Sequence, residues 1–392
     1  MRARTELSQD APTRVLALLE SNWVTGPAKN LLGFCRWAHS PEGSAARLRV
    51  SIATYGREPY DEGNNAFVQA ARAAGIDTHV IRERRRFDRG VYPRLAEIVA
   101  DVAPQIVQTH NVKSHFIFKS SGLRKGKIWL AFQHGYQDTD LKLHLYNQLD
   151  RWSLRSADRV ISVCEAFTRR LEAYGVRRER IRVLHNSVTP AVAVPAEGAV
   201  NALRHVLGIE TSDAIILTIG RMSGEKGHAD LLEALRLLPA NVPPWRALLI
   251  GDGPERERLV SLATRLGIAD RVVFAGFRSD VQTFYSVATV LALPSHSEGS
   301  SNVILEAMAA RVPVAATAVG GNPEILTDEE TALLSRGRDP EGLARSLTRL
   351  LTDSMLVARL TAAAHSRAMS RFSPEQYRQN LLEIYSGVRP AD

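Results

Sequence analysis

Residues 216–232 have the sequence ILTIGRMSGEKGHADLL, in which an apolar run stops at Gly220 and a helical pattern follows the next glycines. The run is typical of a buried parallel strand, and the segment after it has the apolar spacing of a helix. Arg221 and Lys226 lie on the loop between the two. A strand, a glycine-containing loop and a helix in this order predict one unit of a parallel α/β sheet.

The same alternation of apolar runs and amphipathic segments extends in both directions from this stretch. In the first half we expect strands at 13–19, 48–54, 78–81, 105–109, 128–132, 159–163 and 180–184. Helical spacing between them is seen, for example, at 64–74, 92–103, 141–155 and 165–174. In the second half we expect strands at 215–219, 247–250, 272–274, 290–293 and 312–315, and closing helices at 355–371 and 374–386 with Ser373 as an N-cap.

A length of 392 residues predicts two or three domains. Residues 189–200, TPAVAVPAEGAV, combine two prolines with small residues and are typical of a linker. We therefore predict an α/β protein of two doubly wound, Rossmann-like domains at 1–188 and 201–370, joined by the linker 189–200. Residues 371–392 are expected to form a C-terminal helix that packs back on the N-terminal domain. A ligand cleft is expected between the domains, at the carboxyl ends of the strands.

Composition excludes several classes of protein. With 45% hydrophobic and 23% charged residues the chain has the composition of a globular protein, and its two cysteines, Cys35 and Cys164, are too few for a disulfide scaffold or a cysteine-based zinc site. The longest apolar run near the start, Val15–Leu19, is shorter than the roughly 7 to 15 residues of a signal peptide. We therefore expect a cytoplasmic protein whose membrane contact, if any, is at the surface.

The excess of positive over negative charge is confined to the first half of the chain. Residues 1–198 hold 30 Lys and Arg against 20 Asp and Glu, whereas residues 199–392 hold 20 against 22. Such a field attracts anionic partners, and a merely solvated basic face is the alternative. Nucleic acid is not expected, because no aromatic stacking platform or recognition motif accompanies the charge. The candidate patch for an anionic membrane surface consists of Arg82, Arg84, Arg85, Arg86 and Arg89.

Two segments of the second half have the residues of an anion site. Arg221 and Lys226 can grip phosphate oxygens, although two cations at this spacing could also be solvated. In residues 293–310, LPSHSEGSSNVILEAMAA, Glu298 ends a strand region and a helix start follows, whose free N–H groups favour an anion. Glu306 lies among apolar residues, where a sugar hydroxyl pair would satisfy it; a place on the wet edge of the helix is the alternative.

Other motifs are weaker. Residues 249–259, LIGDGPERERL, resemble a dinucleotide fingerprint, but Arg256 occupies the third glycine position and a tight turn explains the rest. Gly26, in VTGPAKN, and His134, which follows a predicted strand, could each approach a ligand. No H-E-x-x-H, Walker loop or G-x-S-x-G occurs, so metal hydrolase, P-loop ATPase and serine hydrolase are not supported.

Together, GRMSGEKG, GDGPERERL, VVFAGFRSD and residues 295–326, SHSEGSSNVILEAMAARVPVAATAVGGNPEIL, resemble the GT-B fold glycosyltransferases of family 4. The match is close over residues 215–330 and looser elsewhere, where it includes ADRVISVCEAF at 157–167 and VLHNSV at 183–188. Glu298 and Glu306 match the E-x7-E motif of the family.

The resemblance implies a retaining transfer of a sugar from a UDP- or GDP-linked donor, with no cofactor and no bound metal. Arg221 and Lys226 would neutralise the departing diphosphate, helped by the N–H groups of Ser301, Asn302 and Val303. Glu306 would bind the ribose hydroxyls and Glu298 the donor sugar. His134 would contact the sugar near its reacting carbon, and Gly26 would flank the diphosphate; no catalytic base is assigned.

The expected acceptor is an anionic or lipid-linked glycan, as in the synthesis of cell-surface polysaccharides, at the cytoplasmic face of the membrane. Two departures from the family pattern are Thr25-Gly26-Pro27, where a Gly-Gly pair is usual, and Ser187, where a glycine is usual. The first bears on the placement of the acceptor. A sugar-nucleotide epimerase or phosphorylase of the same fold and a non-enzymatic two-lobed binding protein remain as alternatives.

Overall fold

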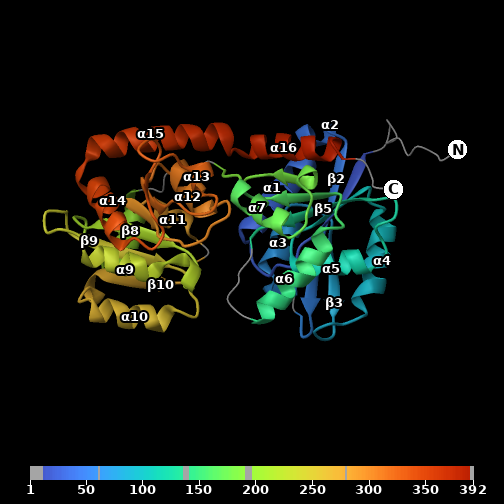
Figure 1. The fold of residues 1–392 in the computed structure, drawn as a ribbon, viewed down its shortest axis with the longest axis horizontal. Helices are drawn as coiled ribbons and strands as arrows, with labels where there is room; N and C mark the ends of the chain where they lie inside the picture. The colour runs from blue at the N-terminus through green and yellow to red at the C-terminus, as the bar shows by residue number, and fades with distance from the viewer. Residues whose placement is uncertain (1–11, 61, 136–140, 190–196, 279, 389–392) are drawn as a thin grey trace. The chain divides into compact units, whose positions relative to one another are not determined.

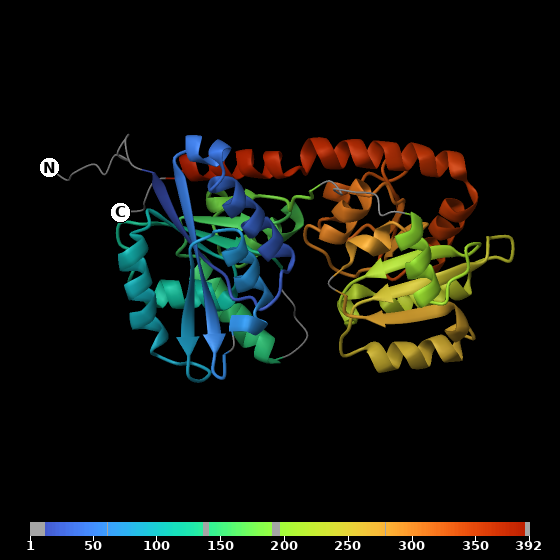
Figure 2. The same ribbon diagram turned by 180° about the vertical axis from the view of Figure 1, so that it is seen from behind.

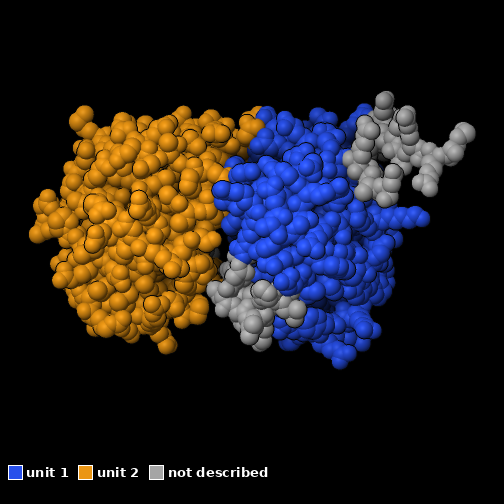
Figure 3. Space-filling model, viewed as in Figure 1, with its two compact units in different colours: residues 1–186, 377–392 blue, residues 187–376 orange. Residues whose placement is uncertain are grey.

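The computed structural model describes residues 12–388 except residues 61, 136–140, 190–196 and 279. The chain divides into two compact units, coloured blue and orange in Figure 3. Unit 1 consists of residues 1–186 together with 377–392, and unit 2 of residues 187–376. Most of the predicted linker, residues 190–196, lies outside the described residues.

Unit 1 contains, among its described residues, a sheet of seven parallel strands in the order β3-β2-β1-β4-β5-β6-β7. The strands are β1 (Thr13–Leu18), β2 (Leu48–Arg57), β3 (Thr78–Glu83), β4 (Ile106–Thr109), β5 (Ile128–Gln133), β6 (Arg159–Ser162) and β7 (Ile181–Val183). The helices are α1 (Gly26–Ala38), α2 (Pro41–Ala45), α3 (Ala66–Ala73), α4 (Val91–Val102), α5 (Val112–Ser120), α6 (Leu141–Leu154), α7 (Glu165–Ala173) and α16 (Pro374–Ser386).

Alternate residues of these strands enter two separate cores, because successive side chains of a strand point to opposite faces. Val15 and Ala17 pack with α1, α3 and α16, whereas Leu16 and Leu18 pack with α4 to α7. Helices therefore cover both faces of the sheet, as Figure 1 and Figure 2 show. The part of α16 in this core is contributed by Leu381, Ile384 and Tyr385, with Val388 just beyond the helix.

Unit 2 repeats the plan with six parallel strands among its described residues, in the order β10-β9-β8-β11-β12-β13. The strands are β8 (Ala214–Ile219), β9 (Trp245–Ile250), β10 (Val272–Gly276), β11 (Val290–Leu293), β12 (Val314–Thr317) and β13 (Leu333–Ser335). The helices are α8 (Glu197–Val206), α9 (His228–Arg236), α10 (Arg256–Arg265), α11 (Gln282–Tyr285), α12 (Asn302–Ala309), α13 (Asn322–Ile325), α14 (Pro340–Thr352) and α15 (Ser354–Arg371).

The second sheet also has a core on each face. Ile215 and Leu217 pack with α11, α12 and α15, and Ala214 and Ile216 pack with α9, α10 and α14. The predicted α/β class with two doubly wound, Rossmann-like domains is thus confirmed. The expected cleft concerns how the two units are placed, and it stays a prediction.

The structure differs from the sequence expectations in detail. Helix α8 begins at Glu197, inside the predicted linker 189–200, where Gly198 in the first turn weakened the helical pattern. Strand β13 was not predicted, because Leu-Leu-Ser lacks the β-branched residues that mark the equally short β7, Ile181–Val183. The N-cap prediction is confirmed, since Ser373 Oγ accepts a hydrogen bond of 3.2 Å from the Gln376 N–H.

Both cysteines, Cys35 and Cys164, are buried free thiols. Among the described residues, no helix is long and apolar enough to cross a membrane.

Candidate active site

An ion pair joins the ends of two neighbouring strands in unit 2. Lys226 lies on the short turn after β8, and Glu298 follows β11, which pairs with β8. Lys226 Nζ donates to Glu298 Oε1 over 2.7 Å, and Ser295 Oγ donates to the same oxygen over 2.6 Å. The side chain of Glu298 is only 8% exposed, so these two donors hold a shielded carboxylate at the carboxyl edge of the sheet.

Two glycines allow the loops around this pair to approach closely. Gly227, with φ +66°, lies where an added Cβ would be 2.0 Å from the carbonyl oxygen of Pro294. Gly320, with φ +55°, lies where a Cβ would be 1.9 Å from the carbonyl oxygen of Glu298. Only glycine fits either position, because both the left-handed backbone and the contact distance exclude a side chain. The loop of Lys226 is thereby held directly against the loop of Glu298.

The second glutamate of the motif is buried on α12. Glu306 is 8% exposed, and its Oε2 accepts a hydrogen bond of 2.9 Å from the Tyr285 hydroxyl. Burial and the carboxylate of Glu306 raise the pKa of Tyr285 well above its usual value, so the phenol remains a donor. The alternative that placed Glu306 on the wet edge of its helix is therefore wrong.

The N-terminus of α12 is open to a hydrogen-bond acceptor. Ser301 is its N-cap, and the Ser301 side chain makes no capping hydrogen bond. The Oδ1 atom of Asn302, the first helical residue, is buried without a partner in the described part of the chain. The N–H groups of residues 301–303, predicted to bind phosphate, thus lie at an uncapped helix start, where the helix dipole favours an anion.

Arg221 lies on the loop after β8 and is exposed. In the described ranges no carboxylate forms an ion pair with it, in contrast to Lys226. Its guanidinium is thus available to an anionic ligand, and its role as a phosphate ligand stays a prediction.

The remaining predicted site residues lie in unit 1. Gly26 is the first residue of α1 and is followed by Pro27, which suits the first turn of a helix. His134 follows β5 directly and is half-buried, with its Nε2 atom 3.4 Å from Nδ1 of His110. Burial, with the nearby His115, lowers the pKa of His134 to about 4. The predicted set is therefore divided between the units, and the roles of Gly26 and His134 stay predictions.

Sequence reasoning did not single out Tyr285 or Ser295 as functional residues. Tyr285 contacts Glu306 from the end of α11, and Ser295 contacts Glu298 from two residues beyond β11. Ser295 is the first residue of the stretch 295–326 but was given no role there. Tyr285 belongs to no motif and reaches its partner only through the packing of α11 against α12. A buried glutamate in an apolar stretch was the one available signal that such a donor exists.

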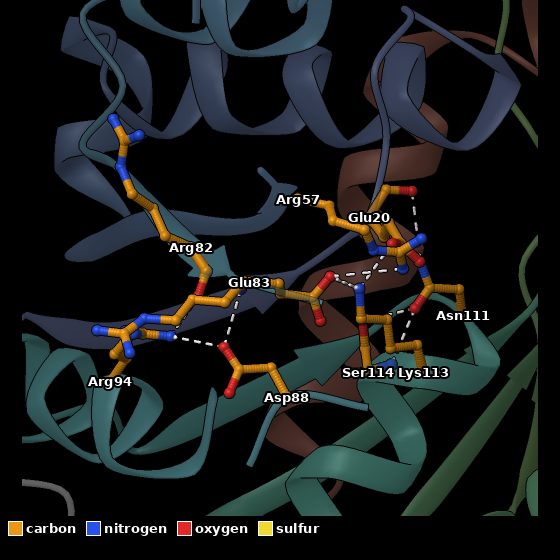
Figure 4. Close-up of polar contacts among 10 residues, drawn as sticks. Glu20, Arg57, Arg82, Glu83, Asp88, Arg94, Asn111, Lys113 and Ser114 are labelled. Atoms are coloured by element: carbon orange, nitrogen blue, oxygen red, sulfur yellow. Dashed lines mark hydrogen bonds and ion pairs between the residues drawn. The ribbon is translucent and has the colours of Figure 1, made fainter. Parts of the chain in front are cut away.

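The arginine-rich loop after β3 is built on one carboxylate. Asp88 accepts from the N–H of Arg84 over 2.9 Å, from the N–H of Gly90 over 2.8 Å and from Arg94 over 3.2 Å. These hydrogen bonds, the two backbone ones first, lower the pKa of Asp88 to about 2. Figure 4 shows Asp88 facing the end of β3 and Arg94. The loop therefore has a defined backbone and is held in place from within.

This loop presents an aromatic ring and unpaired cations to solvent. Phe87 is 79% exposed with φ +62°, and the Arg86 guanidinium lies 5.5 Å from its ring centroid. Arg82, also predicted for the patch, pairs with Glu58 at 3.4 Å. Across the described residues no carboxylate pairs with the side chains of Arg84, Arg85, Arg86 or Arg89. The arginine loop, defined here as residues 84–90, thus keeps an uncompensated positive charge.

A charge-balanced network lies at the carboxyl edge of the same sheet. Lys113 Nζ lies 2.7 Å from both Glu20 Oε1 and Glu83 Oε2, and Arg57 lies 3.7 Å from the same oxygen of Glu83. Figure 4 shows these side chains converging between β3 and α5. Two cations face two carboxylates, so this edge carries little net charge.

Comparison with known families covers most of the chain. Residues 200–367 match the family described as Glycosyl transferases group 1, and residues 42–192 match Glycosyltransferase Family 4.

Two curated relatives show how far the similarity extends. The lipopolysaccharide core biosynthesis glycosyltransferase LpsE of Rhizobium meliloti is 32% identical over 230 residues, which are 59% of this chain and 64% of that protein. The D-inositol 3-phosphate glycosyltransferase of Acidothermus cellulolyticus is 35% identical over 242 residues, or 59% of this chain and 53% of that protein. The chain thus spans between about half and two thirds of the length of these relatives.

Solved structures share the fold of this chain. The crystal structure of Anabaena HepE in complex with UDP-glucose superposes with a TM-score of 0.79 at 20% identity, covering 96% of this chain and all of that one. WaaG, a glycosyltransferase involved in lipopolysaccharide biosynthesis, gives a TM-score of 0.70 at 18% identity over 95% of this chain. With two doubly wound sheets and both family matches in chain order, the protein belongs to the family 4 glycosyltransferases of the GT-B fold.

Proposed function

We propose that this protein transfers a sugar from a nucleoside diphosphate sugar to an acceptor hydroxyl, with retention of configuration at the anomeric carbon. The observation that carries the proposal is the Lys226–Glu298 pair beside the uncapped start of α12, with Glu306 buried four residues into that helix. Cations and free N–H groups suit a diphosphate, and carboxylates suit sugar hydroxyls. HepE, whose fold the chain shares, has been crystallised with UDP and with UDP-glucose.

In this proposal each residue stabilises one part of the donor. Lys226 has three N–H donors, so it can hold Glu298 and a phosphate oxygen at once. Arg221 adds a second cation from the same loop, and the start of α12 adds backbone donors. These groups are fixed before the reaction and face the charge that grows on the leaving diphosphate, which is how a preorganised site lowers a barrier. The two cations supply the neutralisation that a divalent ion supplies elsewhere, so we propose that no metal is needed.

Glu306 and Glu298 have different tasks in this scheme. The Tyr285 hydroxyl occupies Oε2 of Glu306 and fixes the orientation of the carboxylate, which we propose accepts from the two ribose hydroxyls. Glu298 is held by Lys226 and Ser295 and is proposed to accept from hydroxyls of the transferred sugar.

We further propose an anionic or lipid-linked glycan as acceptor, in the assembly of a cell-surface glycan. Two similar proteins are named for a lipopolysaccharide core and for D-inositol 3-phosphate, and the second of these compounds is an anion. The excess of positive charge in residues 1–198 favours such an acceptor. The proposed setting is the cytoplasmic face of the membrane.

The arginine loop supports contact with an anionic membrane surface. Each cation near such a surface contributes about 1 kcal/mol, and an aromatic ring adds apolar burial at the headgroup level. Holding Phe87 at φ +62° and 79% exposed brings no packing gain within the chain. A ring that enters the lipid interface would account for this exposure.

The proposed function is tested first by nucleotide binding. The protein is heated with UDP, GDP, ADP or CMP, and a nucleotide at about 100 times its Kd should add about 2.7 kcal/mol to the free energy of unfolding. We expect UDP or GDP alone to shift the melting temperature, and Lys226→Ala to reduce the shift. No shift with any nucleotide in folded protein would contradict the donor site and favour the binding-protein alternative.

Turnover then separates the enzymatic alternatives. The matching nucleotide sugar, such as UDP-glucose, is incubated with and without D-inositol 3-phosphate or a lipopolysaccharide core fragment, and nucleoside diphosphate release is measured. A transferase releases it at a rate that depends on the acceptor. Turnover without any acceptor would favour an epimerase, and turnover with phosphate alone a phosphorylase. The proton coupling constant of the new anomeric centre reports whether configuration is retained.

A further inference from the structure

A row of polar side chains in unit 1 leads from the C-terminal helix to His134. The His110 ring lies between two neighbours, 4.3 Å from the Phe132 centroid and 5.7 Å from the His134 centroid, with all three rings close to parallel. His110 Nδ1 lies 3.4 Å from His134 Nε2, and His110 Nε2 lies 3.3 Å from Gln108 Oε1. The Gln108 amide in turn contacts the hydroxyl of Tyr385 on α16. Four residues from three segments thus form one continuous chain of polar contacts.

The direction of each hydrogen bond follows from the end of this chain. Gln108 Nε2 donates to the Tyr385 hydroxyl, so the other amide atom, Oε1, is the one that faces His110. An amide oxygen only accepts, which places a proton on Nε2 of His110. Burial lowers the pKa of His110 well below its usual value, so the ring is neutral and its Nδ1 is an acceptor. His134 must then donate to it from Nε2.

The same reasoning fixes the second nitrogen of His134. Its pKa is lowered to about 4, so at neutral pH the ring carries one proton, and that proton is on Nε2. Nδ1 of His134 is therefore unprotonated. Within the described residues Nδ1 has no hydrogen-bond partner, so it can accept from a hydroxyl of a ligand.

A separate network holds the backbone of His134. Gln133 Nε2 donates to Asp150 over 3.0 Å, and Gln133 Oε1 accepts from the Gly135 N–H over 2.5 Å. Asp150 also lies 2.6 Å from His115 Nδ1, and both side chains are fully buried. The residues directly before and after His134 are thereby held by this network. Only the ring of His134 depends on the row of side chains that ends at Tyr385.

We propose that Tyr385, Gln108 and His110 are positioning residues that hold His134 as the Nε2–H tautomer, with Nδ1 presented as an acceptor to a substrate hydroxyl. The inference rests on the proposed function only where it calls the ligand a substrate. The tautomer of His134 is a property of the protein alone. Its structural basis is that α16 belongs to the core of unit 1, which brings Tyr385 to Gln108 across 277 residues of sequence. A flipped Gln108 amide, with the tyrosine donating, would give the opposite tautomer.

The test is a long-range proton–nitrogen NMR spectrum of the full chain labelled with ¹⁵N-histidine, which distinguishes protonated from unprotonated ring nitrogens. The His134 signals are identified by their loss in His134→Gln. We expect Nε2 to be protonated and Nδ1 to be unprotonated at neutral pH. A protonated Nδ1 at His134 would overturn the proposal.

Tyr385→Phe tests the relay, and Tyr377→Phe is its matched control on the same helix and in the same core. Tyr385→Phe frees the Gln108 amide to flip, so we expect a mixture of both His134 tautomers, while Tyr377→Phe keeps the single form. Loss of one neutral hydrogen bond, about 1 kcal/mol, predicts a fall of about fivefold in kcat for sugar transfer with the donor KM unchanged. An unchanged tautomer in folded Tyr385→Phe contradicts the relay.

The two proposals fail in different ways. If no sugar is transferred by the wild type, the proposed function fails, while the NMR spectrum of the unliganded protein still decides on the relay. If Tyr385→Phe does not fold, Gln108→Met, which keeps the side-chain length and removes the amide, is expected to give the same mixture of tautomers. A single Nε2–H form in folded Gln108→Met would also contradict the relay.

Discussion

Lys226 and Glu298, eight residues before Glu306 in the same motif, form a direct ion pair with Nζ and Oε1 2.7 Å apart. Two groups predicted to bind different parts of a donor are thus bound to each other in the unliganded protein. The pair holds both side chains in place, so a ligand meets a site that is already ordered.

Removing the lysine should destabilise the fold. Glu298 is 8% exposed, so in Lys226→Ala its carboxylate keeps, among the described residues, only Ser295 as a side-chain donor. We expect the free energy of unfolding to fall by about 1 to 2 kcal/mol, less than for a fully buried pair, because the side chain of Lys226 is 27% exposed. Urea denaturation measures this change. Arg221→Ala is the control: it should weaken nucleotide binding about tenfold yet change stability by less than about 0.5 kcal/mol.

Glu306 should report on the ribose. If the Glu306 carboxylate accepts from the two ribose hydroxyls, Glu306→Gln should bind the ribonucleotide more weakly. The variant should also lose the preference for the ribonucleotide over its 2′-deoxy analogue. A hydrogen bond to a charged group is worth about 1.5 to 3 kcal/mol, so we expect the wild type to prefer the ribonucleotide by at least about tenfold. Calorimetric titration with both nucleotides gives the two affinities. If the wild type and Glu306→Gln prefer the ribonucleotide to the same extent, Glu306 does not bind the ribose hydroxyls.

The buried histidines predict a loss of stability in mild acid. The pKa of His134 and that of His228 are both lowered to about 4, chiefly by burial, and His228 lies at the start of α9. As the pH falls through 6.5, the unfolded chain takes up protons that the folded protein does not, so stability falls with pH until about pH 4. Between pH 7 and pH 5 each such histidine removes about 2 kcal/mol.

Denaturant titrations at both pH values measure this loss. His228→Gln should reduce the difference between pH 7 and pH 5 by about 2 kcal/mol. His79 is the control, because it is partly exposed and lies 3.3 Å from Asp77, so His79→Gln should leave most of the difference in place. If His228→Gln and the wild type lose the same stability, the nitrogen atoms of His228 are solvated in solution.

Phe87 allows lipid binding to be separated from folding. Its φ of +62° is strained for phenylalanine and suits glycine, so Phe87→Gly should fold at least as stably as the wild type. We expect this variant to bind vesicles of anionic lipid more weakly in a sedimentation assay. Met355, 84% exposed in unit 2, provides Met355→Ser as a control that should bind normally. Equal vesicle binding by wild type and Phe87→Gly would assign the exposed ring another purpose.

The sequence could predict the sheets because their strands are apolar runs between amphipathic helices. Twelve of the strands among the described residues coincide with expected runs, whereas β13, Leu-Leu-Ser, has no β-branched residue to mark it as a strand. The charged residues of the candidate site could also be found, since Lys226, Glu298 and Glu306 belong to a recognisable motif. Their supporting partners could not, because Tyr285 and Tyr385 meet Glu306 and Gln108 only through packing between distant segments.

The core of unit 1 contains Leu381, Ile384, Tyr385 and Val388, so this unit is closed by residues that follow all of unit 2 in the chain. The residues of unit 2 are therefore complete in the chain before those of unit 1, whose hydrophobic core lacks one wall until α16 is added. A chain truncated before residue 381 would contain every residue of unit 2, but Phe34 of α1 would lack its contact with Tyr385. The histidine row of such a chain would have no terminal tyrosine.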